Sequence, residues 1–97
     1  MMYLQASIKL HPGKLPDFIS LINEIAPFIN KKHGWKLLGS YGGLVGRLNT
    51  VVDWWEVPDA NAVTALLTDP DFQKWGPRIH DIVEDEVLTI LTKLPIG

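Results

Sequence analysis

Hydrophobic and polar residues alternate at the start of the chain. Leu4, Ala6, Ile8 and Leu10 are apolar, whereas the residues between them are mostly polar. This period of two is typical of a strand whose one face is buried, because successive side chains of a strand point to opposite faces. The pattern therefore predicts a strand over residues 3–10.

The next apolar residues recur at intervals of three and four, which predicts a helix over residues 15–33. Gly34 follows it and suits a left-handed cap. Pro27 lies inside the pattern and cannot donate a backbone hydrogen bond. We therefore expect the helix to kink or break near Ala26 and to continue as two segments.

The second half of the chain predicts a β-hairpin, short helices and a last strand. Aromatic and β-branched residues dominate 35–41 and 49–57, and the glycines between these segments supply a turn. Prolines at 58, 70 and 77 suit the first turns of short helices, and 86–94 has the composition of a strand. The order is βαββαβ, so we predict an α+β fold of the ferredoxin-like type with an antiparallel sheet.

The strand over 49–57 is apolar on both faces. Val51, Trp55 and Val57 lie on one side by alternation, and Val52 and Trp54 lie on the other, where we expect Trp54 in a core. Helices can cover only one face of the sheet. The sequence therefore predicts a homodimer in which the other sheet face packs against a second copy.

Composition narrows the function further. The 97 residues are predicted to form a single domain, 1–97. The net charge of −2 without a Lys/Arg run argues against nucleic-acid or membrane partners, and the absence of cysteine excludes disulfides and thiolate chemistry. No dinucleotide or phosphate-loop glycine motif occurs. His80 and Glu84 lie one helical turn apart and could give half a metal site or an acid/base pair, but a solvated charged face is favoured, so neither a cofactor nor a metal is expected. We expect a cytoplasmic protein.

Two segments carry a resemblance to a known family. The hairpin residues 35–41 (WKLLGSY) and 46–55 (GRLNTVVDWW) resemble the hairpin of the NIPSNAP family, and 69–72 (DPDF) with Trp75 resembles its later helix. The resemblance covers essentially the whole chain and implies a dimeric α+β barrel. The family commonly carries a histidine where this chain has Asp53. Related barrels include cofactor-free monooxygenases, decarboxylases and isomerases that act on aromatic or polyketide-like molecules.

Several polar and aromatic residues are candidates for a site. Asn49, Asp53 and Trp55 share one strand face by alternation, which can orient a flat ligand. The alternative is that Trp55 packs in the interface and Asp53 makes a structural hydrogen bond. The further ligand-binding candidates are Tyr41, Arg47, Trp75 and His80, each of which also suits a packing or solvated role.

Three functions are compatible with these residues. The first is a dimeric domain that binds an apolar or aromatic small molecule between sheet and helices. The second is a cofactor-free enzyme of the monooxygenase or isomerase type, with Asp53 or His80 as proton acceptor and Asn49 or Arg47 stabilising an enolate-like oxygen. The third is a structural or interaction dimer without a ligand.

Overall fold

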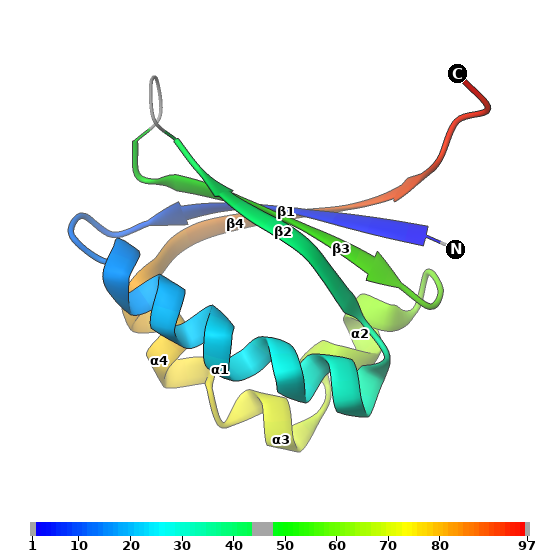
Figure 1. Ribbon diagram of the computed structural model, residues 1–97. Coiled ribbons are helices and arrows are strands. Elements are labelled where there is room, and N and C mark those ends of the chain that lie inside the picture. The colour runs from blue at the N-terminus through cyan, green and yellow to red at the C-terminus, as the bar shows by residue number, and fades with distance from the viewer. Residues whose placement is uncertain (1, 44–47, 97) are drawn as a thin grey trace.

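The computed structural model describes residues 2–43 and 48–96, and its elements follow the order that the sequence predicts (Figure 1). Their bounds are β1 Met2–Leu10, α1 Leu15–His33, β2 Lys36–Gly42, β3 Thr50–Val57, α2 Ala62–Leu67, α3 Pro70–Gln73, α4 Gly76–Ile82 and β4 Val83–Thr92. The second helical region is therefore three short helices in sequence. The last strand begins three residues earlier than predicted, and β3 begins one residue after Asn49.

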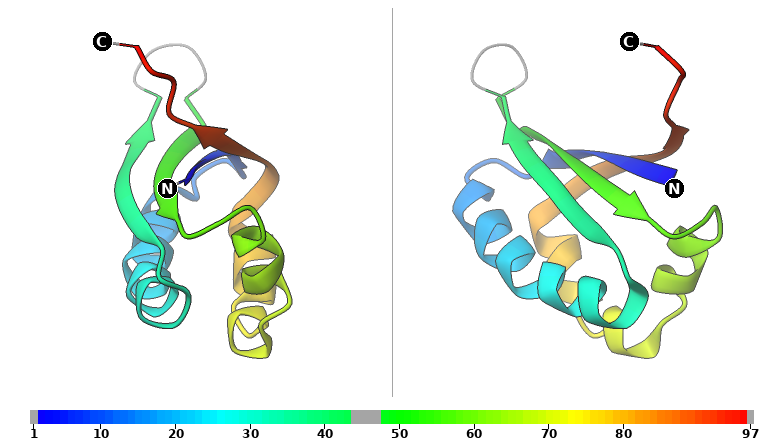
Figure 2. Two further views of the ribbon diagram at one scale, coloured as in Figure 1. Left: turned by 90° about the vertical axis from the view of Figure 1, so that its right-hand side faces the viewer. Right: turned by 45° about the vertical axis from the view of Figure 1, so that its right-hand side comes forward.

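The strands form one antiparallel sheet in the order β2-β3-β1-β4. All the helices lie on the same face of this sheet. On that face, α1 and the group formed by α2 to α4 lie next to each other, as Figure 2 shows. The other face has no covering layer among residues 2–43 and 48–96. This two-layer arrangement confirms the predicted ferredoxin-like α+β fold.

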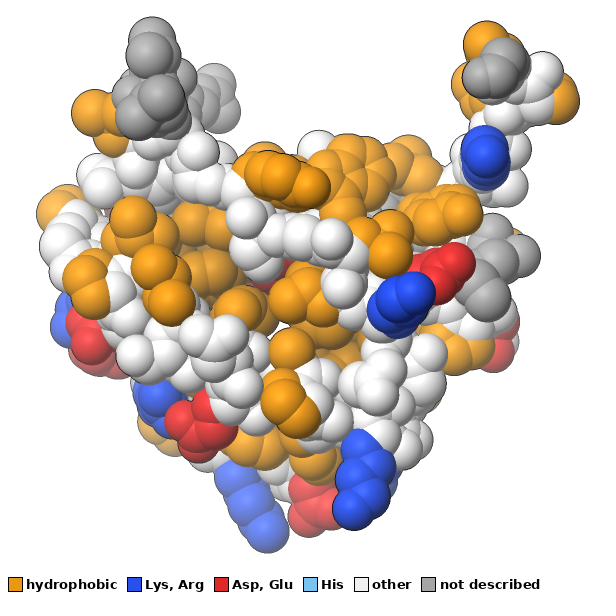
Figure 3. Space-filling view, viewed as in Figure 1, with side chains coloured by type: hydrophobic (Ala, Val, Ile, Leu, Met, Phe, Trp, Pro, Cys, Tyr) orange, Lys and Arg blue, Asp and Glu red, His pale blue; other side chains and the backbone are white. Residues whose placement is uncertain are grey.

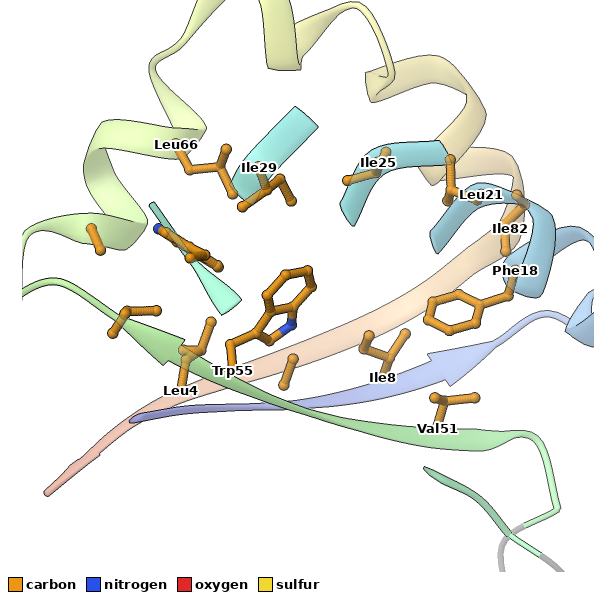
Figure 4. Close-up of a cluster of buried hydrophobic side chains, with 14 of the residues drawn as sticks. Leu4, Ile8, Phe18, Leu21, Ile25, Ile29, Val51, Trp55, Leu66 and Ile82 are labelled. Atoms are coloured by element: carbon orange, nitrogen blue, oxygen red, sulfur yellow. The ribbon is translucent and has the colours of Figure 1, made fainter. Parts of the chain in front are cut away.

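The core lies between the sheet and α1. The inward residues of β1 and β3 are at most 4% exposed, and they meet the apolar stripe of α1 (Figure 4). The buried side chains of that stripe are Phe18, Leu21, Ile25 and Ile29. Because burial alternates strictly along β3, the strand presents one face to this core and the other to the uncovered side.

Helix α1 continues through Pro27, so the predicted break is wrong. Pro27 lies on the exposed side of the helix, between the buried Ile25 and Ile29. The packing of these two isoleucines holds both turns in line, and the backbone carbonyl that loses its partner faces water. The cap is as predicted: Gly34 has φ 74° and its N–H donates to the Asn30 carbonyl at 3.0 Å.

A buried carboxylate joins the end of α1 to the start of α3. Asp69 is 6% exposed and accepts from the Asp71 N–H at 2.9 Å, which caps α3. Lys32 Nζ lies 2.9 Å from Asp69 Oδ1, and His33 Nε2 lies 2.6 Å from Asp69 Oδ2. The hydrogen bond from Lys32, followed by those from His33 and Asp71, holds the pKa of Asp69 well below its usual range.

We expect Asp69→Ala to lower the melting temperature by roughly 5–10 °C at neutral pH, because the cap and the contacts with Lys32 and His33 are lost together. A carboxyl whose folded pKa is depressed stabilises above its unfolded pKa and loses that effect as the pH falls through the folded value. The difference from wild type should therefore narrow below about pH 4. Thermal melting by circular dichroism measures it, and the exposed Asp81→Ala variant is the control. An equal loss in both variants contradicts the assignment.

The uncovered sheet face carries several large apolar side chains. Tyr41 is 61% exposed and Val87 is 58% exposed, while Val52 and Trp54 between them are half-buried. Figure 3 shows orange side chains along this upper surface. Trp54 therefore lies on the uncovered face, and the expectation that it belongs to the core of the chain is wrong.

Candidate functional site

A cavity of about 100 Å³ lies between the sheet and the helices. Apolar side chains dominate its lining, and the strands contribute the floor while the helices contribute the roof. The lining residues that matter below are Ala6, Ile22, Trp35, Asp53, Trp55 and Glu86. Two carboxyl groups thus lie in an otherwise oily space, which is the usual composition of a small-molecule site.

Asp53 is the deepest polar group of the cavity. The alternation of β3 turns it toward the helices between Val51 and Trp55, and it is only 2% exposed. Its Oδ1 atom has no hydrogen-bond partner among the described residues. Burial raises the pKa of Asp53, and the Ser40 hydroxyl, which faces it from β2, offsets part of that rise.

Glu86 is the second carboxyl of the cavity. It pairs with Ile8 across β1 and β4, so its side chain lies on the helix-facing side of the sheet. The residue remains exposed overall, which places it at the rim. The groups packed around its carboxyl nevertheless raise its pKa by desolvation, and the charges of Asp53 and Asp85 add to this rise.

Two tryptophans form the aromatic part of the lining. The rings of Trp35 and Trp55 meet edge to face with their centroids 5.5 Å apart. Figure 4 shows the Trp55 ring above the sheet, with its nitrogen turned toward the Ile8 side of the core. The buried Trp35 Nε1 has no partner within residues 2–43 and 48–96. A flat ligand would find both an aromatic surface and unused polar atoms here.

The volume limits what the cavity can hold. An apolar cavity of about 150 Å³ accepts benzene, and sites for drug-sized molecules measure roughly 300–1,000 Å³. A space of about 100 Å³ is smaller than that, so a branched chain or part of one small ring fits inside it and the remainder of a ligand lies at the rim. A polycyclic substrate does not fit this cavity as it stands.

A groove on the surface leads toward the same place. It runs between α1 and β2, shares Phe18 and Ile22 with the cavity, and includes Ser40 beside Asp53. Figure 3 shows the hollow between these two elements from outside, with apolar side chains around it. The groove is the natural path by which a molecule reaches Asp53, because Phe18 and Ile22 line both spaces.

The structure brings together two of the predicted site residues, Asp53 and Trp55. The others lie elsewhere: Tyr41 is on the uncovered sheet face, Asn49 is exposed near the hairpin, Trp75 packs on Phe28 outside the cavity, and His80 is exposed on α4. Arg47 falls outside the described residues.

Sequence reasoning missed Glu86 and Trp35. The signal for Glu86 was its spacing of two and four from Leu88 and Ile90, which puts an acid on the apolar face of β4. Trp35 precedes β2 and gave no periodic signal.

The described part of the chain contains no group of three or more His, Cys, Asp or Glu side chains that could hold a metal ion. Within the same ranges, no helix is both long and apolar enough to span a bilayer.

A four-stranded antiparallel sheet with helices on one face defines a ferredoxin-like domain of the dimeric α+β barrel class. The chain belongs to the NIPSNAP family, which it matches over residues 3–96. No protein with a curated function matches it.

Solved structures share this fold over nearly the whole chain. A NIPSNAP domain protein from Burkholderia xenovorans is 26% identical, with a TM-score of 0.79, over 100% of this chain and 98% of that one. Protein Atu4242 from Agrobacterium tumefaciens is 23% identical, with a TM-score of 0.80, over 100% and 97%. A protein from Bordetella bronchiseptica described as a candidate antibiotic biosynthesis monooxygenase is 15% identical, with a TM-score of 0.84, over 96% of each chain. These likenesses establish the fold.

Proposed function

We propose that this domain binds a small apolar or aromatic molecule in the cavity between sheet and helices, with Asp53 as its buried polar contact. The observation that carries the proposal is the Asp53 carboxyl, which is 2% exposed and has an oxygen without a partner among the described residues. A buried polar atom left unpaired costs about 1–3 kcal/mol. Such a group is retained more readily where a ligand supplies the missing partner than where it only fills space.

The structural alternative for Asp53 has little support. A carboxylate kept for stability normally accepts several hydrogen bonds, as Asp69 does in this chain. Asp53 faces only the Ser40 hydroxyl across β2, in a setting where burial disfavours its charge. The contrast between these two buried aspartates favours a binding role for Asp53.

A cofactor-free enzyme is the second candidate function. It is favoured by the raised pKa values of Asp53 and Glu86, because a carboxyl with a raised pKa is a better proton acceptor. The fold is also that of the Bordetella bronchiseptica protein described as a candidate monooxygenase. In this chain Asp53 would take the proton. The cavity volume favours a one-ring substrate over a polyketide-like one.

The uncovered sheet face supports a homodimer in which two copies pack sheet to sheet. Its apolar side chains include Tyr41 on β2, Val52 and Trp54 on β3, and Val87 on β4, while β1 between β3 and β4 adds polar residues such as Ser7. A sheet face with several large apolar side chains and no covering layer among the described residues is typical of an interface. The same face could serve a purely structural dimer, so the dimer alone does not decide between ligand binding and a structural role.

Titration with benzyl alcohol, a neutral one-ring probe, tests the binding function. Wild type should show a ligand-dependent change in tryptophan emission, since Trp35 and Trp55 line the cavity, together with a rise in melting temperature. Ala6→Leu places an isobutyl group in the cavity beside Asp53 and should abolish both responses.

Ala65→Leu on the exposed side of α2 is the matched control and should respond like wild type. If Ala6→Leu is poorly folded, Val63→Leu fills the cavity from the helix side instead. The proposal is contradicted if benzyl alcohol changes neither the tryptophan emission nor the melting temperature of wild type. It is also contradicted if Ala6→Leu or Val63→Leu responds as strongly as wild type.

A further inference from the structure

We infer that the ligand of the cavity is a cation, a compact amine whose ammonium group binds Asp53 and whose apolar part fills the space beneath the helices. This inference rests on the binding function proposed above and names the chemical class of its ligand. It is carried by the balance of charged groups around the cavity and by the position of Asp53 within it.

The charges around the cavity all have one sign. Asp53 and Glu86 are its two carboxyls, and no Lys, Arg or His occurs among the described residues that line it. The cations nearest in sequence to the floor strands are engaged outside, since Lys9 pairs with Glu84 at 3.2 Å. A pair of acids without a protein counterion is a site that lacks positive charge, and a ligand can supply it.

The two carboxyls lie at different depths in the cavity. Asp53 is 2% exposed on the floor, beside Ala6, whose small side chain leaves room above the carboxyl. Glu86 lies at the rim, two positions from Leu88 along β4. An ammonium group at Asp53 has Glu86 across the cavity on β4, so both carboxylates favour its binding and both oppose a carboxylate or phosphate.

The aromatic lining suits the same ligand class. Trp35 and Trp55 both border the cavity, and an indole ring attracts a cation held within about 6 Å of its face. A single apolar ring also packs well against these indoles and the aliphatic residues of α1. The ammonium supplies donors for the Asp53 oxygen that no described residue satisfies.

The Asp53 and Glu86 carboxyls also determine how amine binding depends on pH. The groups that face Asp53 are the Ser40 hydroxyl on β2 and the Glu86 carboxyl on β4, whereas α1 and α4 present only apolar side chains to the cavity. Burial raises the pKa of both carboxyls, so as the pH falls they take up protons earlier than exposed carboxyls do, and the charges that hold an amine are lost. Amine affinity should therefore rise with pH as the two carboxyls ionise, and the affinity of a neutral ligand should not.

Three one-ring probes of nearly equal size test the inference: benzylamine, benzyl alcohol and benzoate. Each is titrated into wild type at neutral pH, with tryptophan emission and calorimetry as readouts. We expect benzylamine to bind about tenfold more tightly than benzyl alcohol, and benzoate to bind at least tenfold more weakly than the alcohol. Lowering the pH to about 4, where ordinary carboxyls also begin to protonate, should weaken only the amine.

Glu86→Gln separates charge from shape, because it removes the rim charge and keeps the side-chain size. It should weaken benzylamine several-fold and leave benzyl alcohol unchanged. Glu84→Gln, whose carboxylate pairs with Lys9 instead of lining the cavity, is the matched control and should change neither. Equal affinity for amine and alcohol, or tighter binding of benzoate, overturns the cation inference and leaves the binding function standing. Failure of all three probes overturns both.

Discussion

Replacing Asp53 with leucine should make the unliganded protein more stable while it abolishes ligand binding. Asp53→Leu removes a carboxyl that is 2% exposed and has an unpartnered oxygen, and it adds apolar contacts in the same space. Relief of a buried unsatisfied group is worth about 1–3 kcal/mol. For a domain of this size that corresponds to a rise in melting temperature of roughly 5–15 °C.

The pH dependence of stability identifies Asp53 as the cause. A carboxyl whose folded pKa is raised binds its proton more tightly in the folded state, so it destabilises the fold as the pH rises from its unfolded pKa to its folded one. Wild type should thus lose stability over a window that begins near pH 4, and Asp53→Leu should lose less of it. Glu86 contributes in the same direction in both proteins, so the difference between them reports Asp53.

Chemical denaturation at several pH values measures both effects, with the exposed Asp81→Leu variant as control. The control should show neither the gain in stability nor the change in pH profile. A lower stability of Asp53→Leu at neutral pH would mean that Asp53 holds the fold together, and the proposed function would then lose its main support.

The strands were predictable because burial follows alternation so closely. Burial alternates along β1 and β3, so the sequence indicated both strands and which of their residues share a face. The effect of Pro27 could not, because it depends on which side of α1 meets the core. Its neighbours Ile25 and Ile29 pack on both sides of it, and this tertiary contact outweighs the local preference for a break.

The candidate site was only partly predictable. Alternation placed Asp53 and Trp55 on one face, yet it could not tell which of two apolar faces the helices cover. The spacing of Glu86 from Leu88 and Ile90 indicates which residues share its face, but Val87 and Leu91 make the other face of β4 apolar too, so only the pairing of β4 with β1 shows that Glu86 faces the helices. Tyr41 and Trp75 were proposed as site residues only because they are aromatic. Aromatic residues also occur in interfaces and cores, so residue type alone did not locate these two side chains.

A charged substitution on the uncovered sheet face should prevent dimerisation. Val52→Asp should convert a homodimer into a monomer, so that the mass in solution falls from twice 10.9 kDa to 10.9 kDa at micromolar concentration. Val52 lies between Ser7 and Tyr41 on neighbouring strands, near the middle of that face. A two-fold interface contains every substituted position twice, so one substitution buries two unpaired carboxylates.

Light scattering on the eluting protein measures the change, and Thr64→Asp on the exposed side of α2 is the control that should stay dimeric. The monomer should also melt at a lower temperature, because a domain of this size gains stability from the surface that dimerisation buries. A wild-type protein that elutes as a monomer at the same concentration contradicts the interface. Asp53 lies on the opposite side of the sheet, so Val52→Asp alters the cavity only through β3. If the monomer still binds benzyl alcohol, the ligand site is separate from the dimer contact.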